Sequence, residues 1–330
     1  MARSLAFGVL GAAKIAPRAL VEPCADDPSV SIRCVAARAR ARAESFARDH
    51  GIPRVHDGYE EVIADAGIDA VYNPLPISLH KRWTIEALRA GKHVLCEKSF
   101  AANAQEAEEM ARVAAETGLV LMDAFHYRYH PVFRRAREVV ESGQLGAIRT
   151  VEAAFHVPVT DPEDIRMNYA TGGGVTMDIG CYPISWARHI TGEEPVEVTA
   201  TAEVGPPHVD TFLAAELRFP SGTLARVSGD MRPGVRLRMD LKVSGERGEL
   251  YVRNPLVPQM GHRIDLDLGG EKTSEELDHR TTYAYQLDAF GAAVRDGKPL
   301  WTDAEDAVQQ MRLIDRCYET AGLPRRGLTL

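Results

Sequence analysis

An aspartate and a tyrosine four residues apart, Asp178 and Tyr182, are the side chains best suited to proton chemistry. They lie at the predicted start of a helix, where residues at i and i+4 share one face. Hydride loss from an alcohol carbon needs a base for the hydroxyl proton, and the reverse reaction needs an acid. A tyrosine titrates near pH ~10, so it needs nearby positive charge to serve at neutral pH. Alone, Asp178 is also explained as a helix N-cap and Tyr182 as a packing residue.

A glycine turn joins the first predicted strand to the first predicted helix, with the pattern Gly11-x-Ala13-x-x-Ala16. In the dinucleotide fingerprint the three positions serve the tight turn, the approach of the backbone to pyrophosphate and the packing of the helix. Because Ala13 replaces the middle glycine, a turn without a ligand is an open alternative. A strand-to-helix turn nevertheless presents free N–H groups to phosphate. The residues expected at the dinucleotide are Gly11, Ala12, Ala13, Lys14 and Ile15.

The end of the second predicted strand carries arginines where an NAD enzyme usually carries an acid for the ribose diol. Ala37 and Arg38 follow this strand, Arg40 and Arg42 come next, and the first acid is Glu44. An arginine can pair with the 2′-phosphate of NADP. A solvated helix face is the alternative. The pattern favours NADP over NAD, with Ala37, Arg38 and Arg42 at the cofactor.

Short apolar runs alternate with helical patterns through the first 125 residues. Such runs are typical of strands buried on both faces, and repeated strand–helix units predict a parallel, doubly wound Rossmann sheet. A capping box is predicted at Asn103–Glu106, with a helix end at Gly118. The predicted strands are 5–10, 31–36, a weak one near Val55, 70–73, 93–96 and 119–122.

The pattern changes near residue 125. Beyond it, alternating segments separated by turn signals predict an open, mostly antiparallel sheet with inserted helices. The expected domains are therefore residues 1–125, binding the cofactor, and 126–330, an α+β domain for substrate binding and oligomerisation. The predicted helices here are 132–142, 179–190, 282–296 and 303–320, and the predicted strands are 148–156, 196–204, 212–219, 223–230, 236–243 and 249–252.

Length and composition limit the function classes. The 330 residues suggest about two domains, and 45% hydrophobic with 26% charged residues is ordinary for a globular chain. A net charge of −8 argues against nucleic acid or an anionic membrane surface as a partner. The five cysteines form no zinc-like spacing, so we expect free thiols and no metal. Neither a membrane helix nor a signal peptide is recognised, so a cytoplasmic protein is expected.

Three segments resemble the Gfo/Idh/MocA oxidoreductases, named for glucose–fructose oxidoreductase and inositol dehydrogenase. Glu97-Lys98-Ser99 is similar to the family's Glu-Lys-Pro after the fifth strand. Gly172-Gly-Gly-Val-Thr-Met-Asp178-Ile-Gly-Cys-Tyr182 is similar to its triple-glycine segment. The segment 122–131 resembles the one that follows the family's sixth strand. The resemblance covers essentially the whole chain.

The resemblance implies a role for each matching residue. Lys98 would bind the reacting oxygen and the cofactor, Asp178 would orient the substrate, and Tyr182 would donate or accept the proton. Arg166 and Asn168 would bond sugar hydroxyls, with an exposed loop as the alternative. Further cofactor contacts are expected at Asn73, Pro74, Leu75, His80 and Glu97, substrate contact at Arg128, and closure of the pocket at Tyr283; His80 and Arg128 are equally explained as structural.

Two positions depart from the family pattern. Ser99 stands where the family usually has proline, and a cis bond before a non-proline residue costs about 2.5–4 kcal/mol. We therefore expect a trans Lys98–Ser99 bond. The other departure is Ala13, which would move the pyrophosphate slightly off the turn.

The resemblance implies an NADP-dependent oxidoreductase acting on a sugar or cyclic polyol, similar to the aldose and dihydrodiol dehydrogenases. Oxidation at C1 of an aldose is the first expectation. Reduction of a keto-sugar, including a nucleotide-linked 3-keto-sugar, is an alternative, and a non-catalytic NADP sensor is another. Because the open sheet must cover an exposed face, a homodimer or homotetramer through the second domain is expected.

Overall fold

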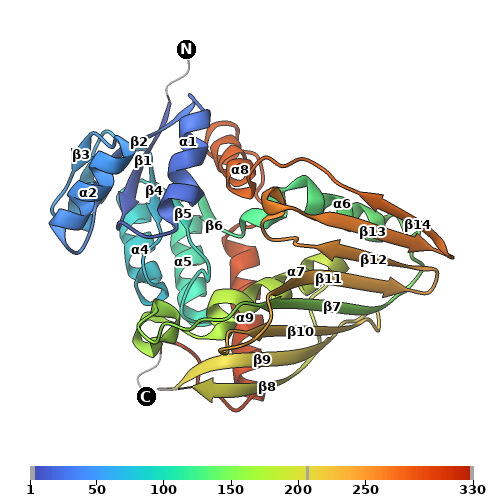
Figure 1. Ribbon diagram of the computed structural model, residues 1–330. Helices are drawn as coiled ribbons and strands as arrows, with labels where there is room; N and C mark the ends of the chain where they lie inside the picture. The colour runs from blue at the N-terminus through green and yellow to red at the C-terminus, as the bar shows by residue number, and fades with distance from the viewer. Residues whose placement is uncertain (1–3, 206–207, 328–330) are drawn as a thin grey trace. The chain divides into compact units, whose positions relative to one another are not determined.

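The computed structural model describes residues 4–205 and 208–327 (Figure 1). The chain forms two compact units, each assembled from two stretches of sequence. Unit 1 contains the chain up to His126 together with Tyr283–Gln309, and unit 2 contains Tyr127–Thr282 and the residues from Gln310 onward. The domains expected from the sequence were two continuous segments, so the placement of residues 283–309 with unit 1 differs from that expectation.

Unit 1 is built around a six-stranded parallel sheet in the order β3-β2-β1-β4-β5-β6. The order reverses between β1 and β4, which is the switch point where doubly wound sheets bind ligands. The expected Rossmann architecture is confirmed. The strands are β1 (Leu5–Leu10), β2 (Val30–Ala36), β3 (Arg54–Val55), β4 (Ala70–Asn73), β5 (His93–Cys96) and β6 (Leu121–Asp123).

Helices connect the strands of unit 1, and their ends follow local capping rules. The Asn103 side chain accepts a hydrogen bond from the N–H of Glu106 at 3.0 Å, and Gly118 ends the same helix with φ +66°. The helical segments are a π-helical turn η1 (Pro17–Val21) running into α1 (Glu22–Asp26), α2 (Arg40–His50), α3 (Tyr59–Ala64), η2 (Ile77–Leu79), α4 (His80–Arg89), α5 (Ala104–Thr117), α8 (Thr282–Asp296) and the start of α9 (Ala304–Thr320).

The late segment joins unit 1 through both apolar and backbone contacts. The ring of Phe290 on α8 lies 5.5 Å from that of Phe7 on β1. The N–H of Asp123 at the end of β6 donates to the carbonyl of Thr302 at 2.9 Å. These long-range contacts leave no local signal in the sequence, which is why the predicted boundary assigned the segment to the second domain.

Unit 2 is built on an eight-stranded mixed sheet in the order β14-β13-β12-β11-β7-β10-β9-β8. β10 and β7 run parallel and the other neighbours antiparallel, so the expected open, mostly antiparallel sheet is confirmed. Its strands are β7 (Ile148–His156), β8 (Glu197–Gly205), β9 (Val209–Arg218), β10 (Leu224–Asp230), β11 (Arg238–Gly245), β12 (Gly248–Arg253), β13 (Arg263–Leu268) and β14 (Glu271–Glu275).

The sequence prediction missed β13 and β14. β13 alternates buried and more exposed residues, as in Ile264 and Asp265, so its period of two was readable. β14 is a polar edge strand with mostly exposed residues and no such signal. Together they widen the sheet by two strands beyond the predicted set.

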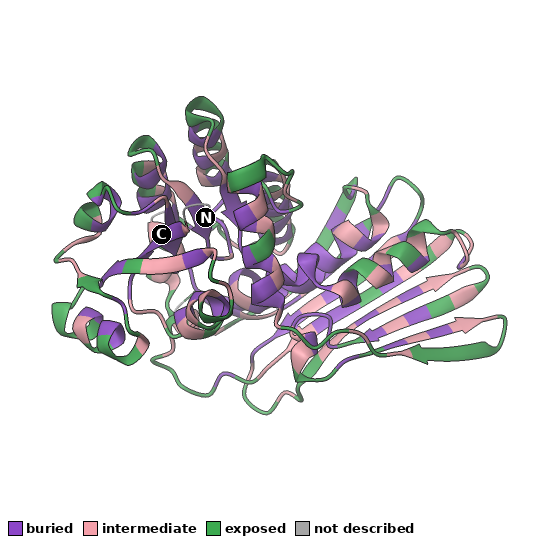
Figure 2. Cartoon of the chain, turned by 90° about the horizontal axis from the view of Figure 1, so that it is seen from above, coloured by how far each residue is buried: buried purple, intermediate pink, exposed green. Residues whose placement is uncertain are grey.

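Helices of unit 2 pack on the sheet and carry the polar candidates. Figure 2 shows strands on which buried and exposed residues alternate, as expected for a sheet with one covered face. The helical segments include α6 (Pro131–Glu141), η4 (Ile165–Met167), η5 (Tyr169–Thr171), the π-helical turn η6 (Thr176–Gly180), α7 (Cys181–Thr191), η7 (Pro258–Met260) and the rest of α9. Along the chain, η3 (His126–Tyr129) begins with the last residue of the first stretch of unit 1. Within the described ranges, no helix is long and apolar enough to cross a membrane.

Candidate active site

The glycine turn after β1 contains a left-handed residue, as a tight strand-to-helix turn requires. Gly11 has φ +96°, a left-handed conformation that favours glycine, and its N–H donates to the carbonyl of Ala36 at 2.6 Å. A Cβ on Gly11 would come within 3.1 Å of Leu75 on the β4 loop. The turn therefore lies against the loop after β4, at the switch point of the sheet. Ala12, Ala13 and Ile15 are partly exposed there, and Lys14 is exposed.

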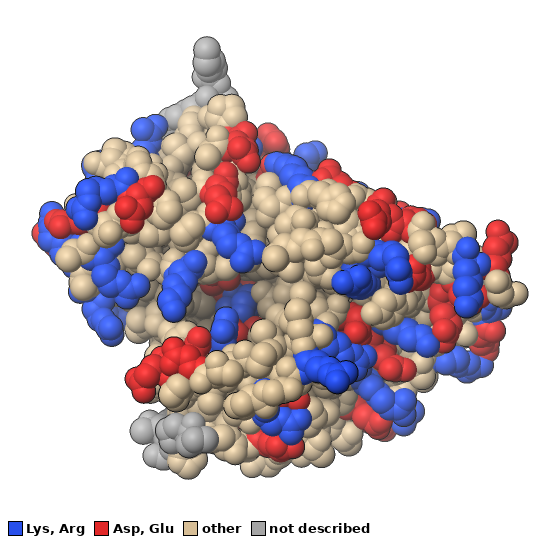
Figure 3. All heavy atoms as spheres, in the orientation of Figure 1, with Lys and Arg blue, Asp and Glu red and all other residues tan. Residues whose placement is uncertain are grey.

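The three arginines after β2 have different partners. Arg40 is paired with Glu44 at 2.9 Å and with Asp57. Arg42 donates to the carbonyl of Ala12 in the glycine turn at 3.1 Å. Arg38 is exposed and forms no ion pair with any acid in the part of the chain that the structure describes. Figure 3 shows basic side chains gathered over α2, with acidic ones between them.

These contacts test the fit of a phosphorylated dinucleotide. The acid nearest in sequence, Glu44, is held by Arg40, so it is not poised for a ribose diol. The Arg38 guanidinium, which no described acid pairs with, could bind a 2′-phosphate. Arg42 connects the start of α2 to the glycine turn through Ala12. The residues present fit NADP.

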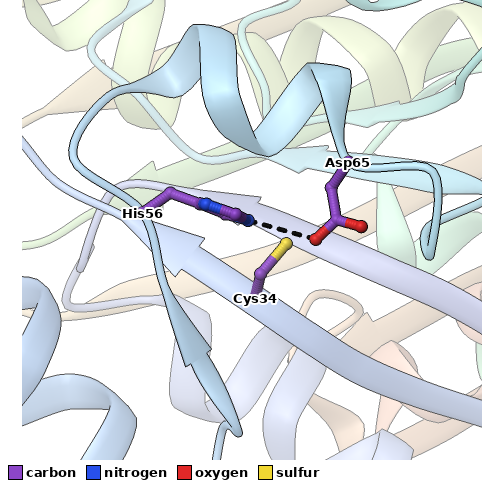
Figure 4. Close-up of side chains that lie close together, drawn as sticks. All are labelled: Cys34, His56 and Asp65. Atoms are coloured by element: carbon purple, nitrogen blue, oxygen red, sulfur yellow. Dashed lines mark hydrogen bonds and ion pairs between the residues drawn. The ribbon is translucent and has the colours of Figure 1, made fainter.

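A partly buried polar network lies on β2, the strand that leads to Arg38, and on its neighbours (Figure 4). Asp65, after α3, accepts from Arg54 at 2.9 Å and lies 3.1 Å from His56 Nε2. The Cys34 thiol on β2 lies beside them, and burial with the charge of Asp65 raises its pKa to about 12. A metal ion here would have to displace the Arg54 guanidinium from the carboxylate. The cluster therefore connects β2, β3 and α3 as an ion-paired network.

The ends of β4 and β5 are connected through buried polar groups. The Tyr72 hydroxyl donates to Glu97 at 2.7 Å, and Asn73 donates to Thr84 at 3.2 Å. His80 is fully buried, with Nε2 2.7 Å from the carbonyl of Leu75 and Nδ1 3.0 Å from that of Ser99. His80 thus holds the two loops together. Its ring is not exposed for a ligand, as expected of a structural residue.

The peptide bond between Lys98 and Ser99 is cis, so the expectation of a trans bond is wrong. That expectation rested on the local cost of a cis bond before serine. Ser99 is 1% exposed and its carbonyl lies against His80, so packing around the segment outweighs the local preference. Lys98 is partly exposed directly after the buried Glu97. Pro74 and Leu75 line the neighbouring loop and are buried.

Asp178 is held by an arginine of the preceding loop. Arg166 Nε lies 2.5 Å from Asp178 Oδ2, and Arg166 Nη1 lies 3.5 Å from Asp164 Oδ2. Asp178 lies inside the π-helical turn η6, whose N-cap residue is Val175. The N-cap explanation of Asp178 is therefore wrong, because its carboxylate is directed to Arg166. π-Helical turns are frequent at functional sites.

A buried ion pair anchors the triple glycine before Asp178. Gly174 has φ +129°, and a Cβ there would collide with the Asp210 carboxylate. Asp210 accepts from the N–H and hydroxyl of Thr176 at 2.9 and 2.6 Å and pairs with Arg326, both side chains being fully buried. Arg326 also donates to the carbonyl of Gly173 at 2.8 Å. Arg326 thereby fixes the turn that precedes η6.

Tyr182 lies on the first turn of α7 and is 5% exposed. Its ring meets Tyr127 and Phe155 edge-on, with centroids 6.2 and 5.9 Å away. Tyr127 is fixed in turn by a 2.7 Å hydrogen bond between its hydroxyl and that of Ser185. The packing explanation and the catalytic one are therefore compatible, because the aromatic contacts hold the phenol ring in one orientation.

The remaining candidates occupy different settings. Asn168 is exposed and its side chain accepts from the N–H of Ala170, which makes it part of the loop turn. Arg128 is 5% exposed in unit 2. Tyr283 is buried in unit 1, with its ring 4.1 Å from that of His126. Closure of the pocket by Tyr283 stays a prediction.

The candidates thus form two sets. Unit 1 contains the cofactor set and Lys98, and unit 2 contains Arg128, Arg166, Asn168, Asp178 and Tyr182. Sequence reasoning missed the buried acid Asp123, on which burial and the charges of Asp306 and Glu97 raise the pKa well above its usual value. A charged residue at the end of the apolar strand β6 was the available signal.

Comparisons with known proteins match nearly the whole chain. The model of the oxidoreductase family with an NAD-binding Rossmann fold matches residues 5–125, and that of the GFO/IDH/MocA C-terminal domain matches residues 133–251. The NADP(+) D-xylose 1-dehydrogenase 2 of Haloferax volcanii is 34% identical over 316 residues, which is 96% of this chain and 97% of that protein. A dTDP-3,4-didehydro-2,6-dideoxy-alpha-D-glucose 3-reductase of Actinomadura kijaniata is 30% identical, with 95% of each chain covered.

Solved structures agree with the fold. The aldose-aldose oxidoreductase of Caulobacter crescentus, complexed with glycerol, has a TM-score of 0.89 at 28% identity, covering 97% of this chain and 98% of that one. A 3-ketoreductase of Actinomadura kijaniata, in complex with NADP and TDP-benzene, has a TM-score of 0.87 at 29% identity, covering 95% and 96%.

Unit 1 is a Rossmann sheet with a fingerprint turn, and unit 2 is an α+β unit that carries Asp178 and Tyr182. Together they define the chain as a dinucleotide-dependent oxidoreductase. It belongs to the Gfo/Idh/MocA family, so the resemblance found in the sequence is confirmed.

Proposed function

We propose that this protein is an NADP-dependent oxidoreductase of sugars or cyclic polyols, with oxidation at C1 of an aldose as its reaction. The observation that carries the proposal is Arg38, whose guanidinium has no acidic partner among the described residues, beside a fingerprint turn. The likeness to an NADP(+) D-xylose 1-dehydrogenase over 96% of the chain supports both cofactor and substrate class.

NADP would be held by residues of unit 1. The glycine turn and the N-terminus of η1 would receive the pyrophosphate, and Arg38 and Arg42 the 2′-phosphate. Further contacts would come from the loops after β4 and β5, which His80 holds in place: Asn73, Pro74, Leu75, Glu97 and Lys98. When bound, NADP supplies the hydride acceptor or donor of the reaction.

The chain's own residues would handle the substrate and its proton. Lys98 follows the end of β5 and would bind the reacting oxygen. Tyr182 would take the hydroxyl proton in oxidation and return it in reduction. Asp178 would orient the substrate. Arg128 and Asn168 would add contacts to sugar hydroxyls.

Reduction of a keto-sugar is the second candidate. The 30% identity to a dTDP-keto-sugar 3-reductase, and the TM-score of 0.87 to a 3-ketoreductase, favour it specifically. Reduction is the reverse of the oxidation, with Tyr182 donating the proton that it takes in oxidation, so the same residues would act in both directions. A non-catalytic NADP sensor is disfavoured because it would not need Lys98, Asp178 and Tyr182 together.

The test is a panel of aldoses, polyols and keto-sugars monitored by NADPH absorbance in both directions. Formation of NADPH with an aldose supports C1 oxidation, and consumption with a keto-sugar alone supports the second candidate. NADP binding without turnover on any member of the panel would contradict the oxidoreductase proposal and favour the sensor.

We also propose that the protein is a cytoplasmic homodimer or homotetramer assembled through sheet B of unit 2, the eight-stranded sheet. A hollow on this sheet is lined by polar and small residues of β7 to β11, including the ion pair between Arg226 and Glu216 at 2.9 Å. Most soluble oligomers are symmetric, so this face would meet the same face of a second copy. Sedimentation equilibrium would test the assembly, and a monomer at micromolar concentration would contradict it.

A further inference from the structure

The guanidinium of Arg166 lies between two carboxylates. Its Nε is 2.5 Å from Asp178 Oδ2, and its Nη1 is 3.5 Å from Asp164 Oδ2. The Arg166 side chain is 41% exposed, against 24% for Asp178. A group that already uses Nε on Asp178 is better placed to act on a substrate through that carboxylate than by direct contact.

The backbone of Arg166 is fixed as firmly as its side chain. Its N–H donates to Asp164 Oδ1 at 3.0 Å, and its carbonyl accepts from the N–H of Gly174 at 2.9 Å. Gly174 in turn bonds Asp178, whose N–H donates to the Gly174 carbonyl at 3.0 Å. One short chain of hydrogen bonds therefore connects Arg166 and Asp178 through both backbone and side chain.

Electrostatics extend this connection to Tyr182. The pKa of Arg166 is raised, mainly by the charge of Asp178. Desolvation opposes this effect, and the charges of Asp164 and Tyr182 add to it. Arg166 is thus cationic throughout the working pH range. An interaction between two charges is mutual, so Arg166 favours the ionised form of Tyr182, whereas the neighbouring Asp178 carboxylate opposes it.

We propose that Arg166 is a positioning residue that acts on the reaction through Asp178, whose carboxylate it fixes, and through Tyr182, four residues after Asp178. The proposal replaces the sugar-hydroxyl contact expected for Arg166 from the sequence. It rests on the proposed function for its kinetic consequences alone, because the interaction with Tyr182 can be measured without turnover.

The direct test is an NMR titration of protein labelled with ¹³Cζ-tyrosine, in which Tyr182→Phe identifies the resonance of Tyr182. The variants are Arg166→Gln, which removes the charge, and Arg166→Lys, which keeps it. We expect Tyr182 to titrate roughly half a pH unit or more higher in Arg166→Gln, and to return toward the wild-type midpoint in Arg166→Lys. The same midpoint in all three proteins would overturn the proposal. Thermal unfolding checks that each variant is folded.

Kinetics provide the second readout. We expect Arg166→Gln to lower kcat/KM roughly 10- to 100-fold, mainly through kcat, and to move the acidic limb of the oxidation pH profile, on which Tyr182 must lose its proton, to higher pH. The loss should be much smaller in an Asp178→Asn background, because the two residues act together. A raised KM with unchanged kcat and an unmoved pH limb would show direct substrate contact instead.

The control variant is Arg137→Gln on α6, whose guanidinium pairs with Glu141 at 2.5 Å on the surface. It should leave both the Tyr182 midpoint and kcat unchanged. If wild-type protein turns over no sugar, the proposed function fails, and the NMR titration still decides the role of Arg166.

Discussion

Arg326, close to the end of the chain, forms an ion pair with Asp210 in which both side chains are fully buried. Asp210 also accepts two hydrogen bonds from Thr176, and Arg326 holds the carbonyl of Gly173. Tyr318 adds its hydroxyl at 3.2 Å from Asp210. Tyr318 and Arg326 thereby fix, through Asp210 and Gly173, the glycine turn that places Asp178.

Asp210→Asn should therefore destabilise the protein strongly. The substitution leaves the buried Arg326 without its counter-charge, and breaking such a pair from one side costs about 3–5 kcal/mol. Urea unfolding measures the loss. The matched control is Arg226→Gln, which breaks the exposed pair with Glu216 and should cost under ~1 kcal/mol. Similar losses in the two variants would show that the buried pair contributes no more than a surface one.

Arg38→Ala should remove the preference for NADP over NAD. A charge-assisted bond to phosphate contributes about 1.5–3 kcal/mol, so the ratio of the two kcat/KM values should fall roughly 10- to 100-fold. The control is Arg48→Ala, on the exposed last turn of α2. A ratio that survives in Arg38→Ala would mean that another group binds the 2′-phosphate.

Asp123→Asn should stabilise the protein at neutral pH. Burial and the charges of Asp306 and Glu97 raise the pKa of Asp123, although Lys98 opposes them. An acid with a raised folded-state pKa contributes stability below its ordinary pKa of about 3.9 and loses it as pH rises toward the folded value. The melting temperature of the variant should exceed that of wild type more at pH 8 than at pH 4.5. A variant less stable at pH 8 would show that Asp123 is ionised and favourably paired.

His130→Asn should make stability less sensitive to acid. Burial and the charges of His262 and His279 lower the pKa of His130 to about 4, against the opposing effects of the Arg280 carbonyl and Asp278. Its neutral form is thus favoured in the folded state, so its contribution is full above pH ~6.5 and is lost as pH falls toward 4. Asparagine can keep the N-cap bond to Val132. The free energy of unfolding should fall less between pH 7.5 and 5 in the variant; an equal fall would contradict the assignment.

Local patterns predicted most of the fold because the strands of unit 1 are continuous apolar runs, as in Leu5–Leu10. Patterns of this kind contain no information on long-range packing. The contact between Phe7 and Phe290, which places α8 in unit 1, was therefore not predictable. β14 was missed because an exposed polar edge has no apolar periodicity.

In the candidate site, too, local sequence predicted some features and long-range packing determined others. The types and spacing of Asp178 and Tyr182 were readable, but the partner of Asp178 lies twelve residues earlier, in a loop folded back by the triple glycine. The contact of the Ser99 carbonyl with His80 at 3.0 Å was likewise not predictable from local patterns. Spacing identified the reactive groups, and tertiary structure determined what holds them.

The measurement that tests the central claim most directly is the turnover of Lys98→Ala, with NADP binding measured on the same sample. Lys98 is assigned to the reacting oxygen, so kcat on the best sugar of the panel should fall about 10²-fold or more. The dissociation constant for NADP should change little, because the turn and Arg38 are intact. Turnover equal to wild type would contradict the account.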